Sequence, residues 1–213
     1  MKLYGNSLSP FVRKVLVFAA EKSLALDNVQ IERPVMQEEF LRASPLRKMP
    51  ALVDGDFSIA DSTAIIAYLE RKHPTPAMYP ADAASLARAV WFEEFADTVL
   101  SGVVFKTFFN RVVAPKFFHK PGDEAVAVEG EAKDLPPLLN YLESVVAAPG
   151  HFLVGNRLGV ADIAVASMFV NFAHAGIAVS TKTHPKTVAW LASILARPSF
   201  AGLIAAEKKL LAA

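Results

Sequence analysis

Three short segments carry residue types that could do chemistry: Ser9-Pro10, Lys48-Met49-Pro50 and Asp61-Ser62. Serine is a preferred helix N-cap and proline suits the first helical position, so the first segment predicts the start of a helix. A helix N-terminus carries unsatisfied N–H groups and partial positive charge, which stabilise an anion. The Ser9 hydroxyl at this point could donate a hydrogen bond to a thiolate. The simpler alternative is that Ser9 only caps the helix.

The second and third segments also have a binding interpretation and a structural one. A proline just before a strand is a candidate for a cis peptide bond, which would leave the backbone of Met49 open to pair with an extended peptide. The sequence alone favours a trans Pro50 at a strand start. Asp61-Ser62 precedes an apolar helical pattern. These residues could hold the ammonium and carboxylate groups of a ligand, or could simply cap that helix.

The elements around these segments fall into two groups. Hydrophobic spacing in the first third predicts strand, helix, strand, helix, a hairpin around Asp54-Gly55-Asp56 and a third helix, over residues 3–4, 10–22, 29–31, 38–43, 51–59 and 62 onward. The proline-rich segment His73–Pro80 predicts a linker. Helical patterns follow over residues 83–113, 123–146 (interrupted at Pro136-Pro137), 160–175, 185–195 and 199–211. We therefore predict an α/β domain over residues 1–76 and an all-helical domain over residues 83–213.

Composition excludes several classes of function. The chain has 213 residues, 53% hydrophobic and 20% charged, with a net charge of +1, which does not suggest a nucleic-acid partner. The absence of cysteine excludes disulfides, thiolate metal sites and a protein thiol nucleophile, and we expect no metal. The first ten residues lack the apolar core of a secretory signal, and the apolar stretch Ile163–Val179 suits a buried helix. We expect a cytoplasmic protein with no membrane partner.

The whole chain resembles the cytosolic glutathione transferases, with a thioredoxin-like first domain and an all-α second domain. Ser9-Pro10-Phe11-Val12 resembles a CPxC motif with serine in the first position, as in the bacterial, serine-type members similar to the theta, phi and tau classes. Residues 44–50 resemble the family's NPxGxVP segment, whose last proline is cis. Asp61-Ser62 resembles its acidic-Ser pair, and residues 158–164 resemble its capping-box helix.

The resemblance implies a role for each segment. Ser9 would be the catalytic residue that hydrogen-bonds the glutathione sulfur, and Met49, before Pro50, would pair its backbone with the cysteinyl part. Lys48 would lie near a carboxylate of glutathione, and Asp61-Ser62 would hold the γ-glutamyl end. The implied activity is transfer of the thiolate to a hydrophobic electrophile, in detoxification or in peroxide reduction. Glutathione would be a co-substrate, no cofactor would be needed, and the protein would be a homodimer.

Several positions depart from the family pattern. Gly159 replaces the capping Ser or Thr, so that only the Asp162 half of the box remains. Arg47 replaces a common glycine, which alters the loop or adds positive charge. Val35 and Met36 stand where phi-like members have a His-Lys pair, so that contact would come from elsewhere, such as Gln37.

Alternatives remain for the catalytic residue, for the electrophile pocket and for the function. Ser7 rivals Ser9, which we prefer for its CPxC register and its place directly before Pro10, and Tyr4 suits a core residue better. Four phenylalanines could line an apolar pocket for the electrophile: Phe11, Phe105, Phe108 and Phe109. Aromatic residues at helical spacing also suit a core, which is the interpretation we prefer for Trp91 and Phe92. The rival function is a non-catalytic binding or assembly module with the same fold. A glutaredoxin is disfavoured because no cysteine is present.

Overall fold

The computed structural model of the protein describes residues 1–31, 36–147 and 151–212. Contacts divide the chain into two compact units, which are described separately. Unit 1 consists of Met1–Tyr79 together with Pro198–Ala213, and unit 2 consists of Pro80–Arg197. The first crossing between the units falls at the end of the segment predicted as a linker.

Unit 1 is built on a four-stranded mixed sheet with the strand order β2-β1-β3-β4. Strand β1 pairs with β2 in parallel and with β3 in antiparallel, and β3 and β4 form the predicted hairpin. The elements of residues 1–79 are β1 (Lys2–Tyr4), α1 (Pro10–Glu21), β2 (Asp27–Val29), α2 (Glu38–Ala43), β3 (Ala51–Asp54), β4 (Phe57–Ala60) and α3 (Ser62–Lys72). This order confirms the α/β arrangement predicted for the first part of the chain.

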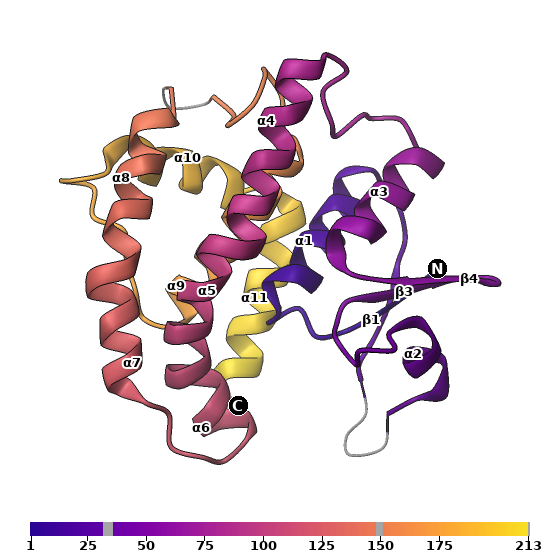
Figure 1. Ribbon diagram of the computed structural model, residues 1–213, viewed down its shortest axis with the longest axis horizontal. Helices are drawn as coiled ribbons and strands as arrows, with labels where there is room; N and C mark the ends of the chain where they lie inside the picture. The colour runs from indigo at the N-terminus through magenta and orange to yellow at the C-terminus, as the bar shows by residue number, and fades with distance from the viewer. Residues whose placement is uncertain (32–35, 148–150, 213) are drawn as a thin grey trace. The chain divides into compact units, whose positions relative to one another are not determined.

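Helices cover both faces of the sheet, with α2 on one side and α1 and α3 on the other (Figure 1). Tyr4 and Ala51 pair across β1 and β3, and both pack with Phe40 of α2 in one apolar cluster. Successive side chains of a strand point to opposite faces. The neighbouring pair Leu3 and Leu52, which is fully buried, therefore faces the layer of α1 and α3.

Strand β2 differs from its prediction. The alternation of Val29 and Ile31 predicted a strand over residues 29–31, but the strand is Asp27–Val29. Its partner β1 offers only Lys2–Tyr4 for pairing, and the register joins Tyr4 to Val29. Ile31 lies beyond the last pair, although it still packs against the cluster that contains Phe40.

The last helix, α11 (Pro198–Ala212), also differs from its predicted place. The sequence pattern predicts it as part of the helical domain, whereas its contacts group it with unit 1. Both polar and apolar contacts hold this helix in unit 1. Glu207 of α11 forms a buried ion pair with Arg13 of α1, and Phe200 is fully buried.

The secondary-structure elements of unit 2 are all helices in its described residues. Its first helical run extends from α4 (Ala83–Glu94) to α6 (Ala114–Phe117) through π-helical stretches, and ends slightly later than predicted. The other elements of the unit are η1 (Phe95–Leu100), α5 (Ser101–Val104), η2 (Phe105–Val113), α7 (Glu124–Glu129), η3 (Gly130–Asp134), α8 (Leu135–Val145), α9 (Val160–His174) and α10 (Pro185–Leu195). Pro136 and Pro137 do not interrupt the second run, because they lie in the first turn of α8, where proline is tolerated.

The core helix of unit 2 is α9, in which every residue from Val160 to Phe172 is buried. This confirms the apolar stretch as a buried helix. The Asp162 carboxylate accepts the N–H of Gly159 at 3.1 Å, the N–H of Leu153 at 2.9 Å and the indole N–H of Trp190 at 3.0 Å. The aspartate half of the capping box is therefore present, and it also fastens the preceding loop and α10 to α9.

Gly5 directly follows β1, at a point where the backbone passes close to α1. Its φ of 146° lies in the region that favours glycine. A Cβ at this position would come within 2.5 Å of the Val12 side chain and 3.2 Å of the Met49 Cβ. Gly5 therefore allows the end of β1, the first turn of α1 and the start of β3 to approach one another.

We expect Gly5→Ala to lower the free energy of unfolding by roughly 2 kcal/mol or more, because it adds backbone strain of about 1–3 kcal/mol and a steric overlap. Gly202→Ala in α11 is the matched control, since no atom lies within 4 Å of its added Cβ. That change should stabilise unit 1 by up to about 1 kcal/mol through helix propensity. Urea unfolding measures both. Equal effects of the two changes would contradict the close approach at Gly5.

A second prediction concerns pH. Burial raises the pKa of Asp162 to about 6, against the lowering effect of its hydrogen bonds. The folded state then binds the proton more tightly than the unfolded state, so this contribution to stability is present below pH 4 and is lost as the pH rises to about 6. The Asp162→Asn side chain cannot titrate. Its amide oxygen can still accept the N–H groups of Leu153 and Trp190, but its NH2 group faces the Gly159 N–H, so that two donors oppose each other.

The wild type should therefore be more stable than Asp162→Asn at pH 4, with a difference that narrows by up to about 3 kcal/mol by pH 7. Urea unfolding of both proteins at unit steps of pH gives this difference directly, because all other titrating groups are common to the two. A difference that stays constant, or that widens with pH, would show that the Asp162 pKa is not raised.

Candidate active site

Ser9 caps helix α1. Its backbone is extended, with φ −73° and ψ 124°, and Pro10 follows as the first helical residue. Its Oγ accepts the N–H of Val12 at 3.5 Å, which is long for a hydrogen bond. The side chain is half-buried, and within the described residues its O–H donates to no protein group. A hydroxyl thus lies at the positive end of α1 with its proton available.

Ser7 and Tyr4 are placed differently. Ser7 lies in the turn before the helix, which Asn6 closes by accepting the N–H of Leu8 at 2.8 Å and that of Ser9 at 3.0 Å. Tyr4 is buried in the cluster with Phe40, and its hydroxyl donates to the Glu39 carboxylate. Burial, and then this hydrogen bond, raise the pKa of Tyr4 to about 12. Tyr4 is therefore a core residue, as its spacing suggested.

The loop before β3 is closed by Ser44, whose Oγ donates to the Lys48 carbonyl at 2.6 Å and accepts the Lys48 N–H at 3.0 Å. Arg47 has a φ of 56°, which is the left-handed conformation that favours glycine. The loop thus keeps the backbone form that the family's glycine permits, and the arginine adds charge to it. The bond between Met49 and Pro50 is cis, as the resemblance implied, and the trans form that the sequence alone favoured is wrong. Lys48 and Met49 are exposed.

Asp61 and Ser62 begin helix α3. Asp61 has a φ of 80°, unusual for a residue other than glycine, and its Oδ1 accepts the N–H groups of Thr63 at 2.9 Å and Ala64 at 3.2 Å. Such a conformation costs about 1–3 kcal/mol and is found preferentially at functional sites. Ser62 is only 2% exposed, and within the described part of the chain its hydroxyl makes no hydrogen bond.

Strand register brings these segments to one edge of the sheet. Tyr4, at the end of β1, pairs with Ala51 at the start of β3, and Ala51 pairs with Ala60 at the end of β4. The three segments lie just beyond these three positions: Ser9-Pro10 after β1, Lys48-Met49-Pro50 before β3 and Asp61-Ser62 after β4. Two helix N-termini and one open strand end therefore share this edge, which suits a peptide-like anion.

The aromatic residues proposed for the electrophile pocket have different environments. Phe11 is half-buried in the first turn of α1 in unit 1. In unit 2, Phe105 is 64% exposed and stacks on Phe109, with ring centroids 4.9 Å apart. Phe108 is only 5% exposed and lies 6.3 Å from the His174 ring of α9. Phe108 is thus a core residue of unit 2, and its ring does not take part in the stacked pair of Phe105 and Phe109.

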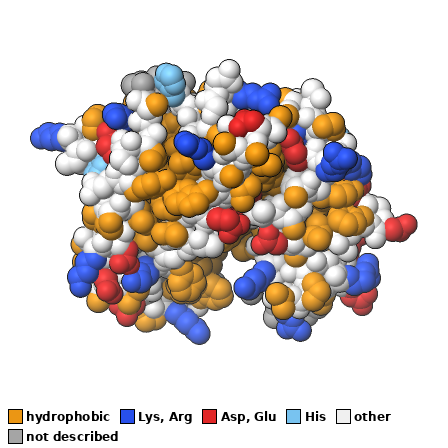
Figure 2. Space-filling model, turned by 45° about the horizontal axis from the view of Figure 1, so that its top comes forward, with side chains coloured by type: hydrophobic (Ala, Val, Ile, Leu, Met, Phe, Trp, Pro, Cys, Tyr) orange, Lys and Arg blue, Asp and Glu red, His pale blue; other side chains and the backbone are white. Residues whose placement is uncertain are grey.

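Sequence reasoning placed Trp91 wrongly, and it found no role for Glu207. Trp91 was predicted as core together with Phe92, but it is 49% exposed whereas Phe92 is 6% exposed. The hydrophobic pattern of α4 gave no signal for this difference. Figure 2 shows that hydrophobic side chains gather in patches on the surface.

Of the two positions where phi-like members have a His-Lys pair, and of the possible substitute Gln37, the structure describes Met36 and Gln37. Val35 lies outside the described residues, and Met36 packs against the cluster under the sheet. The Gln37 amide donates to the Gln30 carbonyl at 2.9 Å.

In residues 1–31, 36–147 and 151–212, no three His, Asp or Glu side chains lie together as a possible metal site. No single helix of the described chain is long and apolar enough to cross a membrane, and one bent pair, α10 with α11, reaches that size only when both helices are taken together.

Comparison with known proteins agrees with this geometry. Residues 3–77 match the family model of the glutathione S-transferase N-terminal domain, and residues 108–207 match that of the C-terminal domain. The mouse glutathione S-transferase theta-3 is 30% identical over 194 residues, which cover 89% of this chain and 80% of that protein. Part of elongation factor 1-gamma from Schizosaccharomyces pombe is 28% identical, over 76% of this chain and 38% of that protein.

A solved structure supports the same assignment. The crystal structure of a glutathione S-transferase from Rhodospirillum rubrum superposes with a TM-score of 0.84 at 30% identity, over 95% of this chain and 90% of that one. The mixed sheet of unit 1 and the helices of unit 2 are therefore the glutathione transferase fold. Sequence, fold and the three segments at one sheet edge agree, and the chain belongs to the glutathione S-transferase family.

Proposed function

We propose that the protein ionises the thiol of glutathione at Ser9 and transfers the thiolate to a hydrophobic electrophile, or to a peroxide. The observation that carries this proposal is the strand register, since it puts Ser9, Met49-Pro50 and Asp61-Ser62 at one edge of the sheet. The Ser9 O–H would donate to the sulfur. The backbone of Met49 would pair with the cysteinyl part of the tripeptide.

The ends of glutathione would be held by charge and by helix dipoles. Ser62 is a buried residue at the N-terminus of α3, and its hydroxyl, which has no protein partner in the described chain, suits the γ-glutamyl carboxylate. The exposed carboxylate of Asp61 has one oxygen engaged in capping α3, and it could face the ammonium. Lys48 and Arg47 bring two cations to the loop beside this edge, suited to the glycyl carboxylate.

The energetics of thiol ionisation are within the reach of Ser9. A free thiol has a pKa near ~8.5, so ionisation at neutral pH needs a shift of about two units, or about 2.7 kcal/mol. A hydrogen bond to a charged group contributes about 1.5–3 kcal/mol. A helix N-terminus contributes about 0.3–1 kcal/mol more. The thiolate would then attack an electrophile, and in unit 1 the half-buried ring of Phe11, in the first turn of α1, suits an apolar contact with it.

The rival function is a non-catalytic binding or assembly module. The similarity to part of elongation factor 1-gamma is the observation that supports this alternative. The two functions differ in what they require of the thiol, because a scaffold has no need to ionise it. Retention on immobilised glutathione, with elution by free glutathione, tests binding. Ionisation is tested separately.

We expect the bound glutathione thiol to have a pKa at least one unit below that in solution, and Ser9→Ala to abolish this shift because it removes the hydrogen-bond donor. Ser7→Ala is the matched control and should leave the shift intact. Thiolate absorbance against pH measures all three proteins. A shift that survives in Ser9→Ala but not in Ser7→Ala would move the catalytic role to Ser7. Binding with an unshifted thiol would favour the non-catalytic module.

The homodimer implied by the resemblance is part of the proposal. In unit 2, α4 presents three exposed apolar side chains: Leu86 at 39%, Val90 at 42% and Trp91 at 49% exposure. The Trp91 ring stacks on that of Phe95 and lies 5.3 Å from the ring of Tyr141 on α8. A partly exposed aromatic cluster of this kind suits the centre of a protein interface.

We expect the wild type to sediment as a dimer and Trp91→Glu to weaken dimerisation by at least about tenfold, because a charge would be buried at the interface. Val128→Glu is the control, since Val128 is also 49% exposed but belongs to α7, which contributes no ring to this cluster. Sedimentation velocity over a dilution series gives the dissociation constants. A monomeric wild type, or equal effects of the two changes, would refute the interface.

A further inference from the structure

Helix α11 is fastened along α1 within unit 1 (Figure 1). Near the start of α1, the Arg13 guanidinium meets the Glu207 carboxylate. At the last residue of α1, the Glu21 carboxylate accepts the hydroxyl hydrogen of Ser199 at 2.6 Å. The segment that ends the described chain therefore reaches the helix that Ser9 caps.

The two contacts between α1 and α11 are separated by the same number of residues along each helix. Arg13 and Glu21 are eight residues apart, and Ser199 and Glu207 are also eight residues apart, in the opposite order along α11. With a rise of ~1.5 Å per residue, each pair spans about 12 Å of helix. The helices are therefore antiparallel and are held at two points in register. One point lies one turn from Ser9, and the other lies at the far end of α1.

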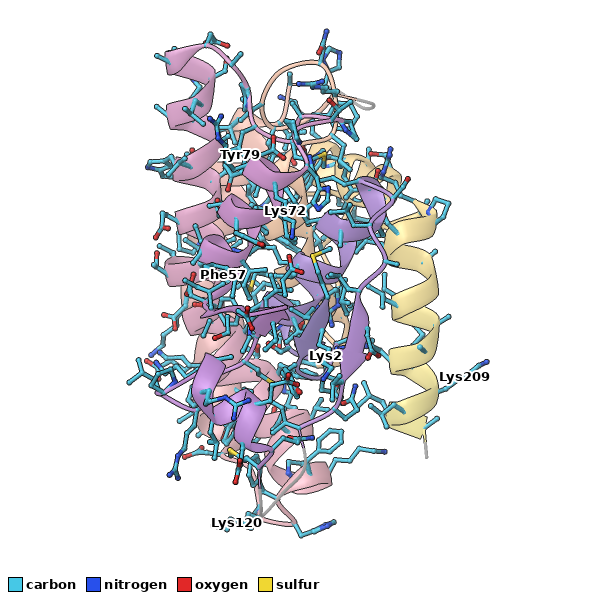
Figure 3. All side chains as sticks on the ribbon, turned by 90° about the vertical axis from the view of Figure 1, so that its right-hand side faces the viewer. Lys2, Phe57, Lys72, Tyr79, Lys120 and Lys209 are labelled. Carbon is cyan, nitrogen blue, oxygen red and sulfur yellow. The ribbon has the colours of Figure 1, made fainter. Side chains whose placement is uncertain are left out.

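The attachment near Ser9 is a buried, two-pronged ion pair. Arg13 and Glu207 are 0% and 1% exposed. The Nε of Arg13 donates to one carboxylate oxygen at 3.0 Å, and its Nη2 donates to the other at 2.8 Å. This fork geometry fixes the orientation of both side chains. Two residues later, Lys209 extends into solvent (Figure 3).

Arg13 connects this ion pair to the candidate catalytic residue through its backbone. The N–H of Arg13 donates to the carbonyl of Ser9 at 2.9 Å, which is the first hydrogen bond of α1. The side chain of Arg13 is thus fixed by α11, and its main chain fixes the peptide group of Ser9. The Val12 N–H that approaches the Ser9 Oγ belongs to the same turn.

We propose that Glu207 is a positioning residue for thiol activation. Through Arg13 it holds the first turn of α1 so that the Ser9 hydroxyl and the free N–H groups of the helix face the sulfur. This inference rests on the proposed function of Ser9. It assigns to α11 a part in the chemistry, although Glu207 lies 194 residues from Arg13 in the sequence.

The test compares the two ends of the attachment. Glu207→Gln keeps the size of the side chain but removes its charge and one acceptor oxygen, whereas Ser199→Ala removes the attachment far from Ser9. We expect Glu207→Gln to raise the pKa of the bound glutathione thiol by half a unit or more, which is roughly a threefold loss in its ionisation constant. Ser199→Ala should leave that pKa unchanged. If Glu207→Gln does not fold, Glu207→Asp, which keeps the charge but shortens the reach, takes its place.

A purely structural role would give a different result. If both variants melt at lower temperature but keep the wild-type thiol pKa, then α11 only stabilises unit 1 and the inference is overturned. An unshifted thiol in the wild type would instead refute the proposed function. Hydrogen exchange of the Arg13 amide in the ligand-free protein separates these failures. Faster exchange in Glu207→Gln, but not in Ser199→Ala, supports the coupling to the first turn; unchanged exchange in both contradicts it.

Discussion

The pairing of Tyr4 with Ala51, and of Ala51 with Ala60, is the constraint on which the site depends. It aligns the end of β1, the start of β3 and the end of β4, so the segments beyond them meet at one edge. A shift of one residue in this register would turn Tyr4 out of the core cluster and would separate the segments. Gly5 is needed at the same place, because a side chain there would overlap Val12 of α1.

Helix α1 connects this edge to the rest of unit 1. Its N-terminus supplies the partial positive charge and Ser9, while its buried side has polar as well as apolar contacts. Lys22, just after the helix, pairs with Glu70 of α3 at 2.7 Å and lies over the ring of Phe18. Burial lowers the pKa of the Arg13 guanidinium, and the Glu207 carboxylate opposes that change. Breaking such a buried pair costs about 3–5 kcal/mol, and α1 is therefore held firmly along its length.

The features that the sequence predicted well are those set by local chemistry. Ser9 before Pro10 and Asp61 before Ser62 begin helices where capping rules place them. The hairpin around Gly55, the division near Tyr79 and the half capping box at Asp162 also follow from short segments. The order of these elements, together with the family resemblance, was enough to predict the fold.

Neighbours far apart in the sequence decided the rest. Phe105 and Phe108 lie on one helical stretch, yet the first is exposed and the second is packed against α9. Trp91 and Phe92 differ in the same way, and β2 ends where its partner β1 ends. The sequence by itself determined where the elements begin and which residues could cap or bind, because those preferences act over a few residues. Only the tertiary structure decided which side chains are buried and that Glu207 meets Arg13, because burial and ion pairing depend on the packing of distant segments.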